Sequence, residues 1–298
     1  MYKIIAIDLD GTLLNSQGEI SEENKIYLKK AIDSGIDVVL ASGRPIDSVE
    51  NLAYEIGANK YLISGNGAVV YGIQEKSILY NKFMSKEQVL RIIKLCKDNS
   101  IYCNVYTENE IIAESLNYNI LFYYRENANK DEEKRTKINI VNDMYKYIES
   151  SQVENYLKIT VCDDSQLIFN SILRKLKTIT DVDVLDVSHM SRKVIKDGTE
   201  RVQIEYFYTE ITNKNVNKWE ALKYIMEKEG IDSSEVVGIG DNINDKELIQ
   251  YSGLGVAMGN SSPDVKEVAK KVVSDNNSDG VAEAIKFFVL SDWNISIV

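Results

Sequence analysis

Acidic side chains follow an apolar segment near the N-terminus at a spacing that suits chemistry on a metal ion. Residues 4–7 are apolar and rich in β-branched side chains, and they break into Asp8 and Asp10, then Gly11 and Thr12. Such a run indicates a short, buried parallel strand. Because unpaired charge is costly to bury, the carboxylates need a cation, hydrogen-bond donors or water. They are either a turn, with Asp10 as its hydrogen-bonding residue, or a nucleophile and a proton carrier beside a hard metal ion.

A second apolar run breaks into carboxylates near the other end of the chain. Residues 236–239 lead into Asp241, Asn244 and Asp245. A helix cap and turn would explain Asp241 or Asn244 singly, but not both together with the distant acidic pair. Carboxylates combined with phosphate oxygens suit Mg²⁺, a hard ion that prefers oxygen ligands. The two acidic segments therefore favour a magnesium site over two unrelated turns.

A hydroxyl residue and a glycine end another predicted strand. The apolar residues 36–41 are followed by Ser42, Gly43 and Arg44. The Ser42 hydroxyl and the Gly43 N–H can donate to phosphoryl oxygens, or the two residues form only a turn. Arg44 either adds positive charge or braces the loop through a salt bridge, and we favour the salt bridge.

Two lysines stand close to the start of a predicted helix. Lys214 and Lys218 precede an apolar face that includes Trp219 and Leu222. A cation at a helix N-terminus is unfavourable for the helix dipole, which makes a specific task for one of these lysines more credible. At the level of local pattern, both remain candidates.

The elements that must position these residues alternate between strand and helix. Strand, helix and strand follow one another along the chain, and each of these strands ends in a polar residue. This alternation predicts strand–helix–strand units, whose crossovers are right-handed. In open parallel sheets, ligands bind outside the carboxyl ends of the strands, where Asp8, Asp10, Ser42 and Asp241 all lie. We therefore expect an α/β fold with a doubly wound, Rossmann-like parallel sheet. The expected strands are 4–7, 36–41, 61–64, 236–239, 255–258 and 272–273. Helices are expected after Ser21, after Lys218, and over residues 46–56, 245–251 and 281–290.

The segment around Asn66 predicts a hairpin. Asn66-Gly67 is a strong turn signal, and residues 69–71 and 77–80 can form strands beside it. Asn66 either faces the site or only shapes the turn, and we favour the turn.

The middle of the chain has a different character. Ser85 opens a helix with a capping box, and from there to about residue 210 no further acidic strand ends occur. We expect an inserted α+β cap domain over residues 85–210 and a core over residues 1–84 and 211–298. Within the cap, the expected strands are 101–106, 110–113, 156–162, 182–187 and 202–208, the expected helices are 116–124, 139–149 and 165–177, and the charged run 125–137 is a loop or an exposed helix start.

Composition restricts the partners and the location. The 298 residues carry a formal charge of −11, which opposes nucleic-acid binding because that needs a basic footprint. No apolar stretch reaches the roughly 18 residues of a membrane span. Met1 to Lys3 run straight into the first strand, which leaves no room for a signal peptide, so we expect a cytoplasmic protein without a membrane or nucleic-acid partner.

The cysteines and the single histidine do not support other hydrolytic classes. Cys96, Cys103 and Cys162 fit neither a zinc pattern nor a disulfide framework, and we expect buried thiols. His189 is the only histidine, and no Gly-x-Ser-x-Gly elbow exists that would form a serine hydrolase with it. We expect a surface or core position for His189.

The motifs together resemble those of the haloacid dehalogenase-like phosphohydrolases, and within them the Cof-type sugar-phosphate phosphatases (subclass IIB), which carry a large α/β cap. The resemblance covers both core segments and the position of the insertion, and Trp219 departs from the usual glycine of the lysine motif. The distance to the Ala221-Leu222 pair favours Lys218 over Lys214. The matching motifs are Asp8-Leu9-Asp10-Gly11-Thr12, Ser42-Gly43, Asn66-Gly67-Ala68, Lys218 and Gly240-Asp241-x-x-Asn244-Asp245.

The resemblance implies a role for each matching residue. Asp8, Asp241 and the main-chain carbonyl of Asp10 would hold Mg²⁺, with Asp245 behind them or bound through water. Asp8 would attack phosphorus, and Asp10 would carry the proton. The expected phosphoryl contacts are the N–H groups of Leu9 and Gly43 together with the side chains of Ser42, Lys218 and Asn244. Supporting positions around the site, without an assigned contact to the phosphoryl group, are expected for Thr12, Arg44, Asn66 and Asp245.

The expected function is a Mg²⁺-dependent phosphomonoesterase that acts on a small phosphorylated metabolite, with sugar phosphates as the family's usual substrates. A phosphomutase or phosphotransferase would use the same aspartyl-phosphate but pass the phosphoryl group to a sugar. A non-enzymatic phosphate sensor is a further alternative, which the presence of Asp10 disfavours because binding needs no proton carrier. The sequence does not reveal the substrate or the oligomeric state.

Overall fold

A computed structural model of the chain describes residues 1–298 except 129–131, 133–134, 186–190, 198–199 and 291–298. The chain divides into two compact units, each of which is described by itself. The first unit comprises Met1–Arg44, Val49–Asn81 and Asn217–Val298, and the second comprises Pro45–Ser48 and Lys82–Val216.

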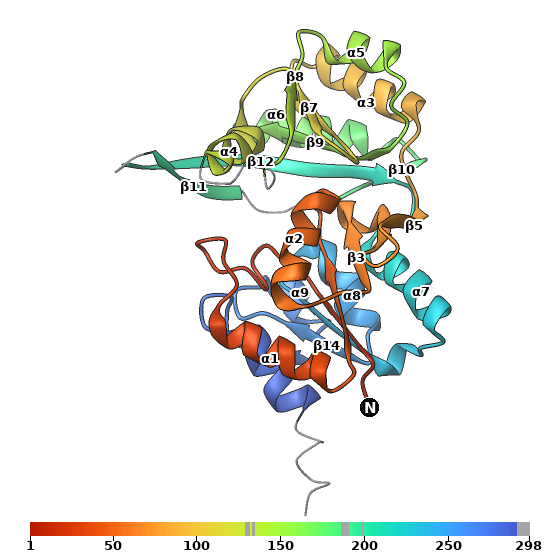
Figure 1. The fold of residues 1–298 in the computed structure, drawn as a ribbon. Coiled ribbons are helices and arrows are strands. Elements are labelled where there is room, and N and C mark those ends of the chain that lie inside the picture. The colour runs from red at the N-terminus through yellow and green to blue at the C-terminus, as the bar shows by residue number, and fades with distance from the viewer. Residues whose placement is uncertain (129–131, 133–134, 186–190, 198–199, 291–298) are drawn as a thin grey trace, which may run out of the picture. The chain divides into compact units, whose positions relative to one another are not determined.

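The first unit, which contains the elements labelled α1, β3 and β14 in Figure 1, is built on an eight-stranded sheet in the order β15-β14-β13-β1-β2-β3-β4-β5. The six strands from β15 to β3 are parallel, and the β3–β4 and β4–β5 pairs are antiparallel. This arrangement confirms the predicted α/β class. The strands are β1 (Ile4–Ile7), β2 (Asp37–Ala41), β3 (Tyr61–Ser64), β4 (Val69–Gly72), β5 (Ser77–Asn81), β13 (Val236–Gly240), β14 (Leu254–Ala257) and β15 (Lys271–Val272).

Both faces of β1 are buried, as expected for a central strand of a doubly wound sheet. Ile4 and Ala6 pack with Leu222 and Leu248 on one face, and Ile5 and Ile7 on the other face are fully buried. The helices are α1 (Glu22–Asp33), α2 (Ile46–Ile56), α7 (Lys218–Glu229), α8 (Lys246–Tyr251), α9 (Pro263–Lys266) and α10 (Gly280–Ala284), and a π-helix (Ile285–Val289) follows α10.

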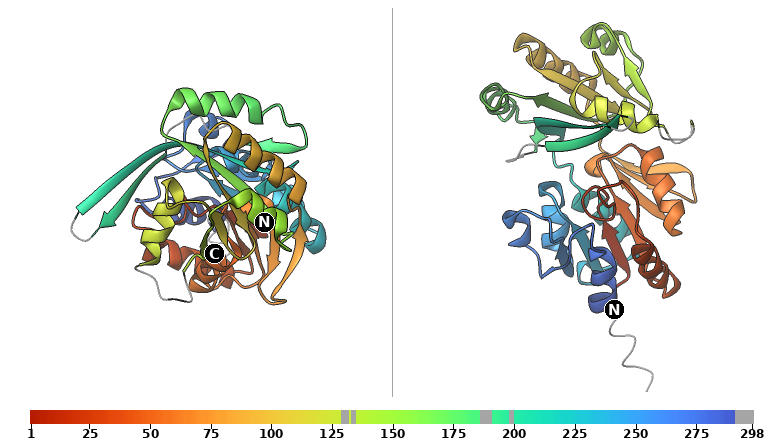
Figure 2. Two further views of the ribbon diagram at one scale, coloured as in Figure 1. Left: turned by 90° about the horizontal axis from the view of Figure 1, so that it is seen from above. Right: turned by 90° about the vertical axis from the view of Figure 1, so that its left-hand side faces the viewer.

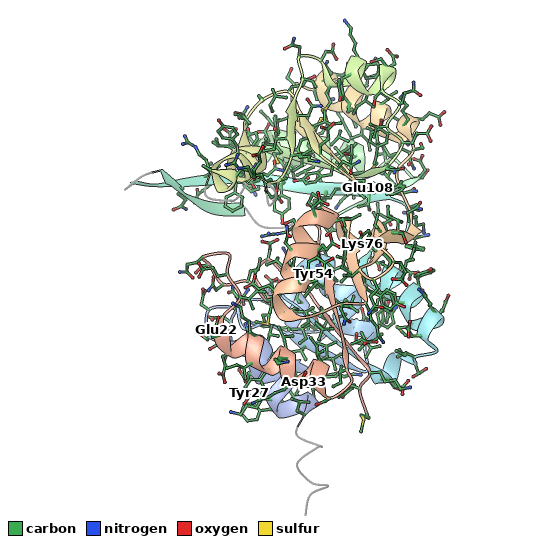
Figure 3. All side chains as sticks on the ribbon, in the orientation of Figure 1. Glu22, Tyr27, Asp33, Tyr54, Lys76 and Glu108 are labelled. Atoms are coloured by element: carbon green, nitrogen blue, oxygen red, sulfur yellow. The ribbon has the colours of Figure 1, made fainter. Side chains whose placement is uncertain are left out.

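Helix α1 begins where its sequence predicts. The Ser21 hydroxyl accepts a hydrogen bond from the Asn24 N–H at 3.2 Å, and Glu22 lies in the first turn, where its charge complements the helix dipole. Figure 3 shows Glu22 and Asp33 toward the two ends of this helix. The Asn24 side chain accepts from the Ala282 N–H at 2.8 Å, which ties α1 to α10.

The second unit is a mainly antiparallel sheet with helices. Its strand order is β10-β12-β9-β6-β7-β8, and β11 pairs with β12 as a two-stranded ribbon (Figure 2). Helices α3, α5 and α6 contribute to the hydrophobic core on one face. The elements are α3 (Lys86–Asp98), β6 (Tyr102–Thr107), β7 (Ile111–Ala113), α4 (Tyr118–Asn127), β8 (Ile138–Ile140), α5 (Met144–Ser150), β9 (Tyr156–Asp163), α6 (Gln166–Leu176), β10 (Val182–Val184), β11 (Ser191–Asp197) and β12 (Glu200–Asn213).

Two predictions for this unit were wrong in detail. The predicted helix 139–149 begins only at Met144, because residues 138–140 pair with β7 as strand β8. Strand β11 was not predicted, and the predicted strand 202–208 is the middle of the longer β12, which pairs with β11, β9 and β10. His189 and the end of the predicted strand 182–187 lie outside the described residues.

The cysteines match their prediction. Cys96, Cys103 and Cys162 are buried free thiols. Among the helices that the structure describes, none has both the length and the apolar composition that crossing a bilayer requires.

Candidate functional site

Three carboxylates from two segments meet beyond the carboxyl ends of β1 and β13. These strands pair in parallel with Ile7 opposite Ile239, so the residues that follow them emerge at the same edge of the sheet. Asp8, Asp241 and Asp245 each offer a carboxylate oxygen within 4.8 Å of the others. The sequence expectation joined Asp8, Asp10 and Asp241 about one ion, with Asp245 behind them or bound through water. The structure brings the carboxylates of Asp8, Asp241 and Asp245 together.

Lys218 is the cation at the centre of this cluster. It is the first residue of α7 and is fully buried. Its Nζ donates to an oxygen of Asp8 and, at 2.6 Å, to an oxygen of Asp245. A charge that is unfavourable for the helix dipole is thus compensated by two carboxylates.

Lys214, the other candidate, lies elsewhere. Its Nζ forms a salt bridge of 2.6 Å with Asp183 within the second unit, and both side chains are substantially exposed. The structure therefore brings Lys218, and not Lys214, to the acidic cluster.

The start of α7 is fixed by a glycine turn. Asn217 caps the helix by accepting from the Glu220 N–H at 2.8 Å. Gly67 has a φ of +102°, and a Cβ there would lie 2.1 Å from the Asn217 carbonyl oxygen. Only glycine permits this approach. The turn Gly65–Gly67, at which Asn66 has a φ of +59°, therefore holds the backbone that carries Lys218.

Asp241 is oriented by residues from two other loops. The Thr12 hydroxyl donates to one of its oxygens at 2.9 Å. The Asn260 side-chain amide donates to the other at 3.3 Å and to the Gly11 carbonyl at 2.8 Å. Asn260 was missed from the sequence, although a polar residue shortly after strand β14 is the same kind of signal that identified the other residues.

Asp245 connects the lysine to the loop after β13. One of its oxygens accepts from Lys218, and the other accepts from the N–H groups of Asp241 and Asn242, each at 3.1 Å. Since both oxygens already accept protein donors, Asp245 is suited to hold Lys218 and the Asp241 backbone in place.

The electrostatics of the cluster show a shortage of positive charge. Burial, and then the neighbouring Asp245, raise the pKa of Asp8 to about 7. Burial, followed by Asp8 and Asp245, likewise raises the pKa of Asp241 well above its ordinary range. Burial alone would lower the pKa of Lys218, but Asp245 and Asp8 outweigh it and raise that pKa. Three carboxylates facing one ammonium group are a donor set that fits a hard divalent cation.

Asp10 is not one of the three carboxylates that meet, although its charge also contributes to the raised pKa of Asp8. Its side chain is 58% exposed. Both of its oxygens accept from Arg44, one from Nε at 2.8 Å and one from Nη2 at 2.6 Å. Arg44 thus forms the salt bridge that we favoured, and its partner is the Asp10 carboxylate.

The remaining predicted residues form a network at the ends of β2 and β3. Ser42 is buried; its Oγ accepts from the Arg44 N–H at 3.2 Å, and its carbonyl accepts from the Asn66 N–H at 2.9 Å. The Asn244 side chain donates to that of Asn66 at 3.2 Å, while its own side-chain oxygen is buried without a hydrogen-bond partner. Asn66 therefore both shapes the turn and contacts a predicted site residue.

Two predicted contacts belong to the backbone. Leu9 is buried, and its carbonyl accepts from the N–H groups of Thr12 and Leu14 at 3.2 and 2.9 Å, which closes the loop after β1. Gly43 lies between Ser42 and Arg44, directly after β2. Both residues therefore lie in loops at the carboxyl edge of the sheet.

Comparison with known proteins gives matches to one family over nearly the whole chain. The profile of the haloacid dehalogenase-like hydrolase family matches residues 5–285. The phosphatase YwpJ of Bacillus subtilis is 27% identical over 287 residues, which cover 95% of this chain and 99% of YwpJ. The 5-amino-6-(5-phospho-D-ribitylamino)uracil phosphatase YcsE of the same organism is 27% identical over 288 residues, covering 97% of this chain and 96% of YcsE.

The fold comparison agrees. A haloacid dehalogenase-like hydrolase of B. subtilis with a solved structure is 25% identical, and the superposition has a TM-score of 0.80. It covers 96% of this chain and 100% of that one.

Proposed function

Because the chain belongs to the haloacid dehalogenase-like hydrolases and is a phosphatase of that family, we propose that it is a Mg²⁺-dependent phosphomonoesterase that uses Asp8 as its nucleophile. The observation that carries the proposal is the convergence of Asp8, Lys218, Asp241 and Asp245 from separate segments. A structural salt bridge would need one carboxylate for one lysine, whereas this cluster leaves buried negative charge that a metal ion would balance.

The metal ion would be held by Asp8, Asp241 and the main-chain carbonyl of Asp10, and when bound it would offset the repulsion between carboxylate and phosphate. Lys218 positions the Asp8 carboxylate through its ion pair, and Thr12 and Asn260 position Asp241.

The reaction has two displacements at phosphorus. In the first, an Asp8 oxygen forms a bond to phosphorus as the bond to the leaving alcohol breaks, which gives an aspartyl-phosphate. Asp10 donates a proton to that alcohol. In the second, water attacks phosphorus, Asp10 takes the proton, and Asp8 is regenerated with release of inorganic phosphate.

The phosphoryl oxygens would be bound by donors from the loops after β1, β2 and β13 and from the start of α7. The Ser42 hydroxyl, the Lys218 ammonium, the Asn244 amide and the N–H groups of Leu9 and Gly43 donate to them as charge develops. The Asn244 side-chain nitrogen donates one N–H to Asn66 at 3.2 Å, and its second N–H is the donor that we assign to the phosphoryl group.

The substrate is a small phosphorylated metabolite, with sugar phosphates as the first class to examine. YcsE, by its name, acts on a phosphorylated ribityl compound, which supports a small polyol-bearing ester. We further propose that residues 85–210 form the domain that selects the leaving group, as in the Cof-type enzymes, and that the protein acts in the cytoplasm.

The test is the variant Asp8→Asn, assayed for phosphate release from an aryl phosphate and a panel of metabolites with and without Mg²⁺. We expect turnover to fall by a factor of about 10³ or more, because an amide cannot form the aspartyl-phosphate. The circular dichroism spectrum should match that of the wild type, and the unfolding transition should stay cooperative. Retained turnover in the variant, or full activity of the wild type after chelation, would contradict the mechanism.

A further inference from the structure

Arg44 is tied on both sides to groups of the proposed site. Its backbone N–H donates to the Ser42 hydroxyl at 3.2 Å, and its carbonyl accepts from the Ser64 hydroxyl at 2.7 Å. Its guanidinium holds both oxygens of Asp10. Arg44 therefore joins the loop assigned to the phosphoryl group to the residue assigned to proton transfer.

The two ends of this ion pair differ in their surroundings. The Arg44 side chain is 11% exposed, whereas that of Asp10 is 58% exposed. The arginine is thus largely enclosed by the protein, while the Asp10 carboxylate borders on water. Asp10 is the more exposed partner of the pair.

The fork of a guanidinium fits a carboxylate and a phosphoryl group in the same way, through two parallel N–H···O bonds. Asp10 lies two residues from the proposed nucleophile, and Arg44 lies two residues from Ser42. If the phosphoryl group binds between these loops as proposed, it brings a second anion to the loops that carry the Arg44 guanidinium and Asp10. Asp10 and the substrate are then alternative partners of one cation.

We propose that Arg44 exchanges partners during binding, releasing Asp10 as it takes up the phosphoryl group. Resting on the proposed function, this exchange makes substrate arrival the event that frees the proton carrier. Without substrate, the salt bridge keeps Asp10 away from the carboxylate cluster. The exchange makes and breaks only hydrogen bonds and ion pairs.

Competition for one cation makes a distinctive prediction for anion binding. Inorganic phosphate is titrated into the protein by calorimetry in the presence of Mg²⁺, a readout that needs no turnover. Asp10→Asn is expected to bind phosphate about fivefold more tightly than the wild type, because the carboxylate that competes with phosphate for the Arg44 guanidinium is gone. Arg44→Met is expected to bind about fivefold more weakly.

The double variant separates exchange from a general change in charge. In Asp10→Asn with Arg44→Met, we expect the affinity of the Arg44→Met protein, with no gain from the Asp10 change. A gain that persists without Arg44, or no gain in Asp10→Asn alone, would overturn the proposal.

Matched controls come from a second two-oxygen salt bridge, that of Arg91 with Asp181 in the second unit, at 2.6 and 2.7 Å. Asp181→Asn and Arg91→Met make the same charge changes and should leave phosphate affinity unchanged; an equal effect from them would also overturn the exchange. If the wild type neither binds phosphate nor releases it from any ester, the proposed function itself fails. If the wild type binds phosphate and releases it from an ester, but the effects of the Asp10 and Arg44 substitutions simply add in the double variant, only the exchange is rejected.

Discussion

At the scale of single residues, the structure distinguishes two lysines that look alike in the sequence. Lys218 is fully buried and pairs with Asp8 and Asp245, while Lys214 forms an exposed pair with Asp183. The same chemical group thus has very different energetic weight in the two places, because removing one partner of a buried pair leaves an uncompensated charge.

Lys218→Met is expected to lower the free energy of unfolding by about 3–5 kcal/mol and to abolish phosphatase activity. Lys214→Met, the matched control, should cost less than about 1 kcal/mol and leave activity within about twofold. Urea denaturation and phosphate release measure both. Similar losses for the two variants would mean that the buried ion pairs carry no special weight.

At the scale of elements, the site depends on where backbone segments meet, and two glycines make this testable. Gly67 and Gly18 both have positive φ, +102° and +79°, but only the Cβ of an alanine at position 67 would collide, with Asn217 at the start of α7. The position at which Lys218 enters the cluster therefore depends on the Gly65–Gly67 turn.

Gly67→Ala is expected to be destabilised by about 1–3 kcal/mol and to lose at least about tenfold in kcat, since a small displacement of Lys218 misplaces the nucleophile. Gly18→Ala carries only the backbone strain, about 1 kcal/mol, and should keep its kcat. Thermal unfolding and steady-state kinetics compare the pair. Equal effects on kcat would show that the approach to α7 is not what matters.

The same elements show what the sequence can and cannot predict. Strand β1 and the loops after β1 and β13 were predicted correctly because each combines an apolar run with carboxylates at its end. The contact of Asn260 with Asp241 was not predicted, and neither was the arrangement in which one Asp245 oxygen accepts from Lys218 and the other from backbone N–H groups. Both depend on contacts between segments that the sequence pattern does not connect. Strand β8 was taken for part of a helix because its three residues gain their extended form only by pairing with β7.

At the scale of the whole molecule, buried like charges link stability to pH and to metal. A formal charge of −11 already disfavours a compact state through repulsion. Asp8 adds to this, since its pKa is about 7 in the folded chain against an ordinary value of 3.8. The folded state without metal therefore binds this proton more tightly than the unfolded state does. The stability that the protonated Asp8 carboxyl contributes is complete below about pH 3.8 and is lost as the pH rises through about 7.

Mg²⁺ should reverse this trend, because a cation in the cluster replaces the proton and favours the ionised carboxylates. We expect millimolar Mg²⁺ to raise the midpoint of thermal unfolding little at about pH 5.5 and by several degrees at about pH 8. In Asp8→Asn the position no longer titrates, so the difference between the two pH values should shrink. The measurement is differential scanning fluorimetry of chelator-treated protein with and without Mg²⁺, and the Mg²⁺-free buffer is brought to the same ionic strength with a monovalent salt to control for general screening. An equal shift at both pH values would mean that the ion does not bind at the carboxylate cluster.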